Sequence, residues 1–168
     1  NDLYIGGQFT AAGTLTTSCI CKYNLSSGDY SALGTTNQTG LSGTGNQNCK
    51  QILPIGSSLL IGGRFNSAGG VPAYGIVKYD TTNSTFSALQ SNGIGTGSLE
   101  YIARFTIIKN ILYVGGYFTS AGGVAVSNIC RYSFYNSISL VSSGITFATL
   151  DNYNNNFVEI KTTTVNSK

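Results

Sequence analysis

Residues 59–89 read LLIGGRFNSAGGVPAYGIVKYDTTNSTFSAL, and the same pattern occurs twice more in this chain of 168 residues. Residues 3–33 read LYIGGQFTAAGTLTTSCICKYNLSSGDYSAL, and residues 112–141 read LYVGGYFTSAGGVAVSNICRYSFYNSISLV. The leading Gly-Gly pair recurs after 56 and then 53 residues. A period of about 50 residues is typical of propeller-type repeats and is longer than that of the common helical repeats.

Each repeat contains short runs of β-branched and aromatic residues separated by polar turns, and no segment has the period of a helix. In the second repeat these runs cover residues 51–55, 59–61, 76–79 and 86–89. The Gly56-Ser57 dipeptide predicts a tight hairpin between the first two runs. Four short antiparallel strands in each repeat predict one blade of a propeller.

The sequence therefore predicts an all-β chain with a single β-propeller region over residues 1–168. It contains three four-stranded blades offset by one strand. The repeat units cover residues 1–48, 49–100 and 101–141, and residues 142–168 supply the first strand of a next blade. Closed propellers have about 4–8 blades. Three blades consequently indicate a partial propeller, or a subunit of a larger ring or filament.

The repeats resemble the kelch-like β-propeller repeat, in which a Gly pair is followed by a variable loop and a strand that ends in Tyr-Asp. Gly62-Gly63 and Tyr79-Asp80 fit this pattern. The Phe-x-x-Ala-Gly motif that follows the Gly pair, from Phe65 to Gly69, resembles the GG-F-x-x-AGG variant found in large secreted and cell-surface proteins, with one residue, Arg64, between the pair and the Phe; the usual Trp of the last strand is absent. The resemblance implies a propeller fold. It does not imply the copper chemistry of the galactose-oxidase relatives, because that site needs His and this chain has none.

The Gly pairs end strands, where glycine supplies either a positive φ or a close backbone approach. No helix follows them to form an anion site. We therefore interpret them as structural turn glycines rather than a phosphate loop, namely Gly6, Gly7, Gly62, Gly63, Gly115 and Gly116.

The composition excludes several function classes. The absence of His excludes Ser-His-Asp and Cys-His catalysis and His-ligated metal sites. Only 9% of the residues are charged, the acidic residues are scattered, and no calcium or phosphate loop is present. We expect no catalytic residue, no cofactor and no metal. Dispersed Lys and Arg do not predict a nucleic-acid partner, and no apolar run approaches the ~18 residues of a membrane-spanning helix.

The two ends of the repeat array differ by one strand. The first repeat lacks its innermost strand, whereas residues 157–165 form a spare strand after the third repeat. We interpret the chain as a mature or excerpted piece. It is an excerpt of a longer propeller, half of a six-bladed ring, or a subunit of a polymer. Because an unpaired strand edge needs a partner, residues 157–165 should pair with a Gly-Gly strand outside the three blades. The expected partners are further blades of the same chain or other copies of it.

The cysteines and sequons indicate the cellular setting. Cys19 and Cys49 begin strands at the same end of neighbouring blades, so they are a candidate disulfide. N-x-S/T sequons mark candidate N-glycosylation at Asn24, Asn37 and Asn83. Together with the low charge, these features predict a secreted or cell-surface glycoprotein.

Three functions follow from these observations. The first is a non-enzymatic extracellular propeller module with a structural, adhesive or self-assembly role, whose further partners include glycans or other surface proteins. The second is a carbohydrate-binding lectin, because repeated blades create repeated pockets. The third is a glycosidase, which needs two converging carboxylates, and only Glu100 and Glu159 enter first strands near a common axis.

Overall fold

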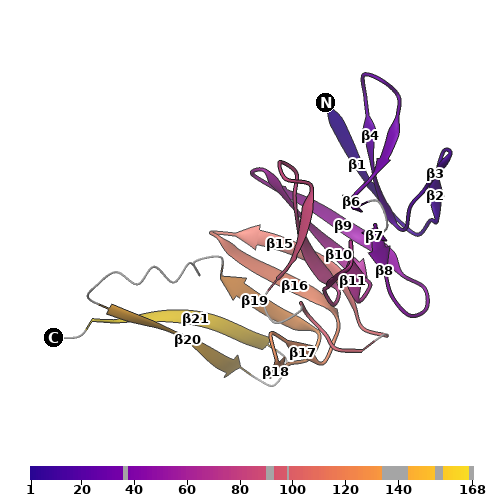
Figure 1. Ribbon diagram of the computed structural model, residues 1–168. Helices are drawn as coiled ribbons and strands as arrows, with labels where there is room; N and C mark the ends of the chain where they lie inside the picture. Colours follow the sequence, from indigo (N-terminus) through magenta and orange to yellow (C-terminus); the bar gives the residue numbers. More distant parts are fainter. Residues whose placement is uncertain (36–37, 90–92, 98, 134–143, 154–156, 167–168) are drawn as a thin grey trace.

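The computed structural model describes residues 1–35, 38–89, 93–97, 99–133, 144–153 and 157–166 (Figure 1). The described residues form strands and turns, with no helix among them. The strands belong to several small sheets that are mainly antiparallel, and none of these sheets closes on itself. The prediction of an all-β chain is therefore confirmed.

The second repeat forms a four-stranded antiparallel sheet in the order β14-β13-β10-β9. Its strands are β9 (Asn48–Ile55), β10 (Ser58–Arg64), β13 (Ile76–Asp80) and β14 (Thr85–Ala88). The predicted hairpin at Gly56-Ser57 joins β9 to β10, with Ile55 opposite Ser58. The sheet is a simple meander, because the first strand of the unit lies at one edge and the last strand at the other.

The first repeat forms a three-stranded sheet in the order β1-β4-β5, which has no counterpart of β9. Its strands are β1 (Asp2–Gly6), β4 (Ile20–Asn24) and β5 (Tyr30–Ala32). Three strands of the third repeat join two strands from residues 142–168 in a five-stranded sheet, in the order β15-β16-β19-β21-β20. Its strands are β15 (Tyr101–Ile108), β16 (Ile111–Tyr117), β19 (Ile129–Ser133), β20 (Gly144–Tyr153) and β21 (Phe157–Asn166).

The spare strand of the sequence, residues 157–165, lies within β21. It pairs antiparallel with β20 and parallel with β19, at Ile129, Cys130 and Arg131. Within one chain this pairing satisfies backbone groups that an isolated strand edge would leave open. The expected ladder with a Gly-Gly strand outside the three sheets concerns a further unit and stays a prediction.

A small hairpin follows the Gly pair in every repeat. The Ala-Gly-Gly motif forms its turn in two of them, with φ of 54° and 79° at Gly69 and Gly70 and of 56° and 82° at Gly122 and Gly123. Two successive positive φ values are those of a type I′ turn, which suits a two-residue hairpin. The short strands are β2 (Ala11–Ala12), β3 (Leu15–Thr16), β11 (Ser67–Ala68), β12 (Val71–Pro72), β17 (Ser120–Ala121) and β18 (Val124–Ala125).

Three further short strands belong to the segment that connects the first sheet to the second. They are β6 (Gly34–Thr35), β7 (Gln38–Thr39) and β8 (Leu41–Ser42). β6 and β7 form a two-stranded hairpin, and β8 pairs with β11 of the next repeat.

Successive sheets pack face to face around two apolar clusters. Leu59 and Ile61 of β10 lie in the cluster shared with the first repeat, whereas Leu60 between them lies in the cluster shared with the third. β10 is buried from Ser58 to Gly63, as expected for a central strand covered on both faces. The second sheet is therefore sandwiched between the other two.

In the first and second repeats, the first glycine of the pair lies where one sheet touches the next. A Cβ atom at Gly62 would overlap the Phe105 ring of β15, and a Cβ atom at Gly6 would overlap the Cys49 thiol of β9. The second glycine of the pair lies against its own first strand, since a Cβ atom at Gly63 would overlap the Asn48 carbonyl.

This geometry corrects the interpretation of the Gly pairs as turn glycines. None of Gly6, Gly7, Gly62, Gly63, Gly115 and Gly116 has a positive φ, and five of these six lie inside strands β1, β10 and β16. Two roles were considered for these glycines, a positive φ and a close backbone approach. The structure shows the close approach.

Substitution of Gly62 by Ala should destabilise the fold by about 1–3 kcal/mol, because the added methyl group must displace a buried aromatic ring. Gly115→Ala is the matched control: only the carbonyl oxygens of Arg104 and Asn128 lie near its Cβ position, at 3.9 and 4.0 Å. Urea unfolding of dilute protein measures both changes. Equal losses for the two variants would contradict the packing role.

Candidate functional site

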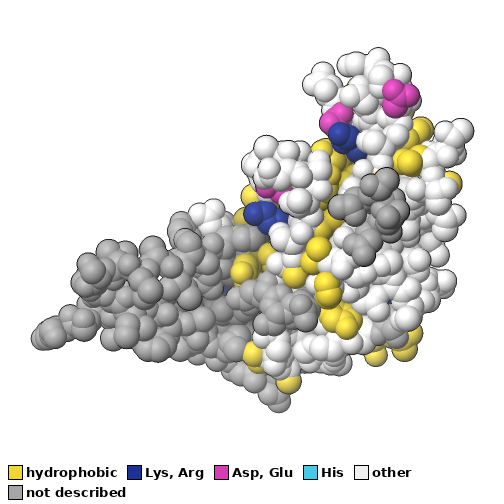
Figure 2. Space-filling view, viewed as in Figure 1, with side chains coloured by type: hydrophobic (Ala, Val, Ile, Leu, Met, Phe, Trp, Pro, Cys, Tyr) yellow, Lys and Arg dark blue, Asp and Glu magenta, His cyan; other side chains and the backbone are white. Residues whose placement is uncertain are grey.

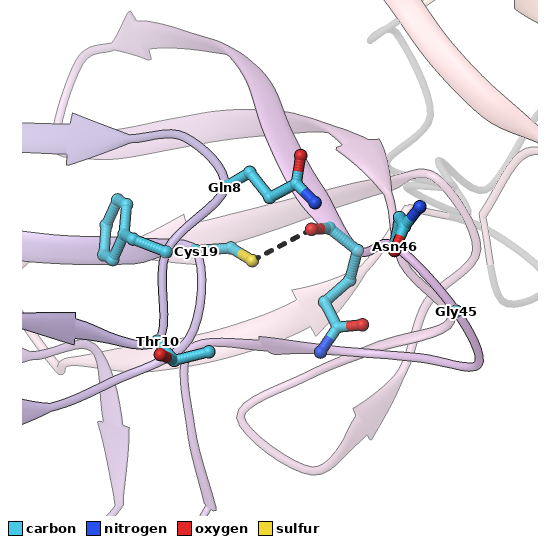
Figure 3. A pocket seen from close by; sticks show the side chains of 7 residues that line it. Gln8, Thr10, Cys19, Gly45 and Asn46 are labelled. Carbon is cyan, nitrogen blue, oxygen red and sulfur yellow. Dashed lines mark hydrogen bonds between the residues drawn. The ribbon is translucent and has the colours of Figure 1, made fainter.

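An open pocket of about 370 Å³ lies where the first two repeats meet. One wall comes from the loop between β1 and β2, and the other from the segment before β9. Figure 3 shows the side chain of Gln8 extending toward the loop that carries Asn46. The lining residues are Gln8, Phe9, Thr10, Cys19, Gly45, Asn46 and Gln47.

The pocket is polar but carries no formal charge. Gln8, Asn46 and Gln47 each offer an amide with both donors and an acceptor, and Thr10 adds a hydroxyl group. The Phe9 ring is half-buried, whereas Gln8, Thr10 and Asn46 are exposed. Amide groups beside an aromatic ring complement a neutral polyhydroxylated ligand, which presents hydroxyl groups on some faces and C–H groups on others.

Cys19 lies at the base of the pocket in an unusual backbone conformation. Its φ is 64°, and the equivalent residues of the other repeats, Gly75 and Asn128, have φ of 65° and 66°. Glycine adopts this left-handed region freely and Asn tolerates it, but a Cys there is strained. The Cys19 thiol donates a hydrogen bond to the Gln47 carbonyl oxygen at 3.3 Å. Cys19 aligns with Gly75 and Asn128, and both of these residue types adopt a positive φ. This alignment was the signal in the sequence for the conformation.

The cysteines are free, buried thiols in the structure. Burial raises the pKa of Cys49 to about 12, the hydrogen bond to the Gln51 carbonyl opposes this rise, and the neighbouring Cys19 adds to it. Burial alone raises the pKa of Cys130 to about 12. Thiols with such pKa values are poor nucleophiles.

Cys19 and Cys49 belong to one apolar cluster, as their strand positions suggested. No disulfide joins them in the structure, where both are free. Their pairing in oxidised protein stays a prediction.

Glu100 braces a loop before the third sheet. Its Oε2 accepts hydrogen bonds from the backbone N–H groups of Thr96 and Gly97. Its Oε1 accepts the N–H and the hydroxyl of Thr119, at 2.7 and 2.6 Å. Burial raises the pKa of Glu100, but these hydrogen bonds outweigh it and lower the pKa overall. The sequence identified Glu100 but did not reveal this role.

The two glutamates of the glycosidase hypothesis occupy different structural settings. Glu100 keeps a low pKa with both oxygens engaged, whereas a glycosidase general acid needs a raised pKa. Glu159 lies in β21, on the far side of the third sheet from β15, with its backbone opposite Asp151 and Arg131. Nothing in this arrangement favours glycoside cleavage.

The sequon residues Asn24 and Asn83 occupy different positions at the turns that follow β4 and β13. The Asn24 Oδ1 atom accepts hydrogen bonds from the N–H groups of Ser26 and Ser27, and Asn24 is half-buried. Asn83 is exposed, and its Nδ2 donates to the Asp80 carboxylate at 3.0 Å. Asn37 lies outside the described residues. Asn83 is the more accessible of the two described acceptors.

Charges of opposite sign are paired on the surface. Lys22 Nζ lies 3.3 Å from Asp2 Oδ2 on neighbouring strands of the first sheet. Hydrogen bonds from Asn83 and from the Thr82 N–H lower the pKa of Asp80, and the nearby Lys78 contributes. Figure 2 shows basic and acidic side chains side by side at two places on this face rather than a patch of one sign. The basic side chains on this face are therefore locally compensated by acidic ones.

Comparison with protein-family models, with curated proteins and with solved structures finds no match to this chain. The described part of the chain holds no helix with the length and hydropathy needed to cross a bilayer. Within the same residues, no three His, Cys, Asp or Glu side chains gather as metal ligands would.

Replacement of Glu100 by Gln should lower the free energy of unfolding by about 1–2 kcal/mol at neutral pH, because charge-assisted hydrogen bonds are lost from a partly exposed site. A carboxylate whose pKa is lower in the folded state stabilises the fold above its unfolded pKa of about 4.3. That contribution disappears as the pH falls through the folded pKa.

Urea unfolding as a function of pH tests this prediction. The difference between wild type and Glu100→Gln should shrink as the pH is lowered below about 4. Asp29→Asn, at an exposed turn, serves as the control and should change stability by less than about 0.5 kcal/mol. A pH-independent difference would show that the carboxylate charge is not involved.

Proposed function

We propose that this chain is a non-enzymatic β-propeller module with a structural or self-assembly role at the cell surface or outside the cell. The supporting observation is that each sheet packs face to face on the next through the same repeat positions. Leu59 and Ile61 face one neighbour, and Leu60 and Gly62 face the other. Repeated face-to-face packing of meander sheets is how the blades of a propeller are arranged.

The acidic side chains support a structural rather than a catalytic role. Asp2 pairs with Lys22, Asp80 holds a turn, and Glu100 braces a loop. Each of these carboxylates stabilises local structure, and hydrogen bonds lower the pKa values of Asp80 and Glu100, whereas a general acid requires a raised pKa.

Imaging of the assembled protein by electron microscopy tests the propeller arrangement. We expect the sheets to be arranged radially around an axis, with β9 and β15 nearest to it and β14 at the outside. Sheets stacked in a straight row without a common axis would contradict the proposal.

The proposed setting outside the cell predicts a glycan at Asn83, since this acceptor is exposed in a turn. Protein from a eukaryotic secretory host should lose apparent mass after treatment with an N-glycosidase, and Asn83→Gln should remove that part of the shift. Thr85→Ala, which destroys the same sequon without changing Asn83, is the matched control. An Asn83 that stays unmodified in secreted protein would count against the prediction.

A second candidate function is the binding of neutral carbohydrate, and the polar pocket between the first two repeats favours it. The lectin hypothesis predicts equivalent pockets with polar and aromatic residues between successive blades, and the first junction offers one of them. Gln8, Asn46 and the Phe9 ring supply such groups at the first junction.

Titration with neutral oligosaccharides, followed by amide resonances, tests carbohydrate binding. Simultaneous replacement of Gln8 and Asn46 by Ala should weaken binding at least about tenfold, because each amide supplies hydrogen bonds to the ligand. Thr106→Ala, at an exposed position of β15, should leave the affinity unchanged. If wild type binds none of the sugars, the lectin candidate fails and the structural proposal remains.

A further inference from the structure

The first and third sheets of the array each have one outer face. These two outer faces carry the same repeat positions as the two faces that meet at each internal junction. Here the back face is the side of the third sheet that bears Ile108, Gly115 and Ile129. The front face is the side of the first sheet that bears Leu3 and Tyr30. Equivalent positions in the other sheets face the internal junctions.

The back face exposes residues whose equivalents are buried. Ile20 and Ile76 begin the third strand of the first and second repeats, and both are 0% exposed, whereas the equivalent Ile129 is 40% exposed. Ile55 packs against the cluster shared by the second and third sheets, but its equivalent Ile108 is 54% exposed. Side chains that are core at the internal junctions therefore face solvent on the third sheet.

The back face also retains the space that a neighbouring sheet fills elsewhere. Gly6 receives the Cys49 and Ile52 side chains of the second repeat, and Gly62 receives Phe105 and Ile102 of the third. At Gly115 the atoms nearest to the position of an added Cβ are backbone oxygens at 3.9 and 4.0 Å, so no side chain of the described residues occupies this place.

The front face shows the complementary pattern. Leu59 and Leu112 are 4% and 0% exposed at the internal junctions, whereas the equivalent Leu3 is 49% exposed. Phe86 is buried by the first sheet, while the equivalent Tyr30 is exposed. These front-face side chains belong to the positions that pack against a preceding sheet.

Backbone edges follow the same pattern as the side chains. Ala68 of the second repeat pairs with Leu41 of the first, and Ala121 of the third pairs with Ile94 of the second. Among the described residues, the equivalent Ala12 pairs only with Leu15 of its own hairpin. A preceding repeat would supply the missing partner, as it does at both internal junctions.

We infer that the back face of one copy of this chain docks on the front face of a second copy, through the same contacts that join its own repeats. The inference rests on the proposed structural function. The occupant is a second copy because the chain itself buries this pair of faces twice, with Gly62 and Leu112 on opposite sides of one junction. A front-to-back contact is heterologous, and it closes a ring when the rotation allows. Two copies would supply six sheets, within the 4–8 of known propellers.

Sedimentation equilibrium of the wild-type chain over a range of concentrations is the first test. We expect reversible association to a dimer. Leu3→Asp in the front face and Ile129→Asp in the back face should each lower the association constant at least about tenfold, because each would bury an unpaired charge. Leu25→Asp places the same charge at an exposed turn outside both faces and should associate like wild type.

A mixing experiment tests the orientation of the contact. Leu3→Asp keeps an intact back face and Ile129→Asp keeps an intact front face, so their mixture should form a heterodimer although neither variant associates alone. Unfolding of the dilute variants should match that of wild type, which excludes misfolding as the cause.

Three results would overturn the inference. They are a wild type that stays monomeric at all concentrations, a mixture that does not associate, or an Ile129→Asp variant that dimerises like wild type. A monomeric wild type would mean that a different partner covers these faces, and it would leave the propeller proposal in place. Sheets that fail to pack radially in the images would contradict the propeller proposal itself.

Discussion

The missing side chain at Gly6 and at Gly62, the first glycines of the first two Gly-Gly pairs, determines how closely successive sheets approach. Gly62 leaves room for the Phe105 ring, and Gly6 leaves room for the Cys49 thiol and Ile52. The rings and aliphatic side chains that enter this space connect the sheets into two continuous apolar clusters. Because interiors are packed to crystal-like density, one methyl group at such a contact must move its neighbours.

The same packing brings the loops of neighbouring repeats together. At the first junction Gln47 lines an open polar pocket. At the next junction the equivalent residue, Glu100, instead binds Thr96, Gly97 and Thr119 and holds its loop closed. The loops at the first junction therefore leave a pocket open, whereas the equivalent loop at the second junction is held by hydrogen bonds to Glu100. Variation of this kind is expected of loops, because the core positions are constrained by packing.

Local features were predictable from the sequence, and contacts between repeats were not. The strands and the Gly56-Ser57 hairpin follow from short apolar runs and turn residues, which act over a few positions. The leading Gly pairs were interpreted as turn glycines, but of the two roles considered for them the structure uses close approach, and Gly69-Gly70 forms a turn. Glu100 was identified as a candidate acid, but its donors include Thr119 from the loop between β16 and β17, which only folding brings near.

The sequence by itself determined the repeat, the all-β class and the order of strands within a unit, because these depend on residue types at short spacing. Only the tertiary structure decided that Cys19 lies at the base of a pocket, and that Ile129 is exposed where Ile76 is buried. The physical reason is that the fate of these residues depends on which surface lies opposite. At the internal junctions that surface comes from the neighbouring repeat.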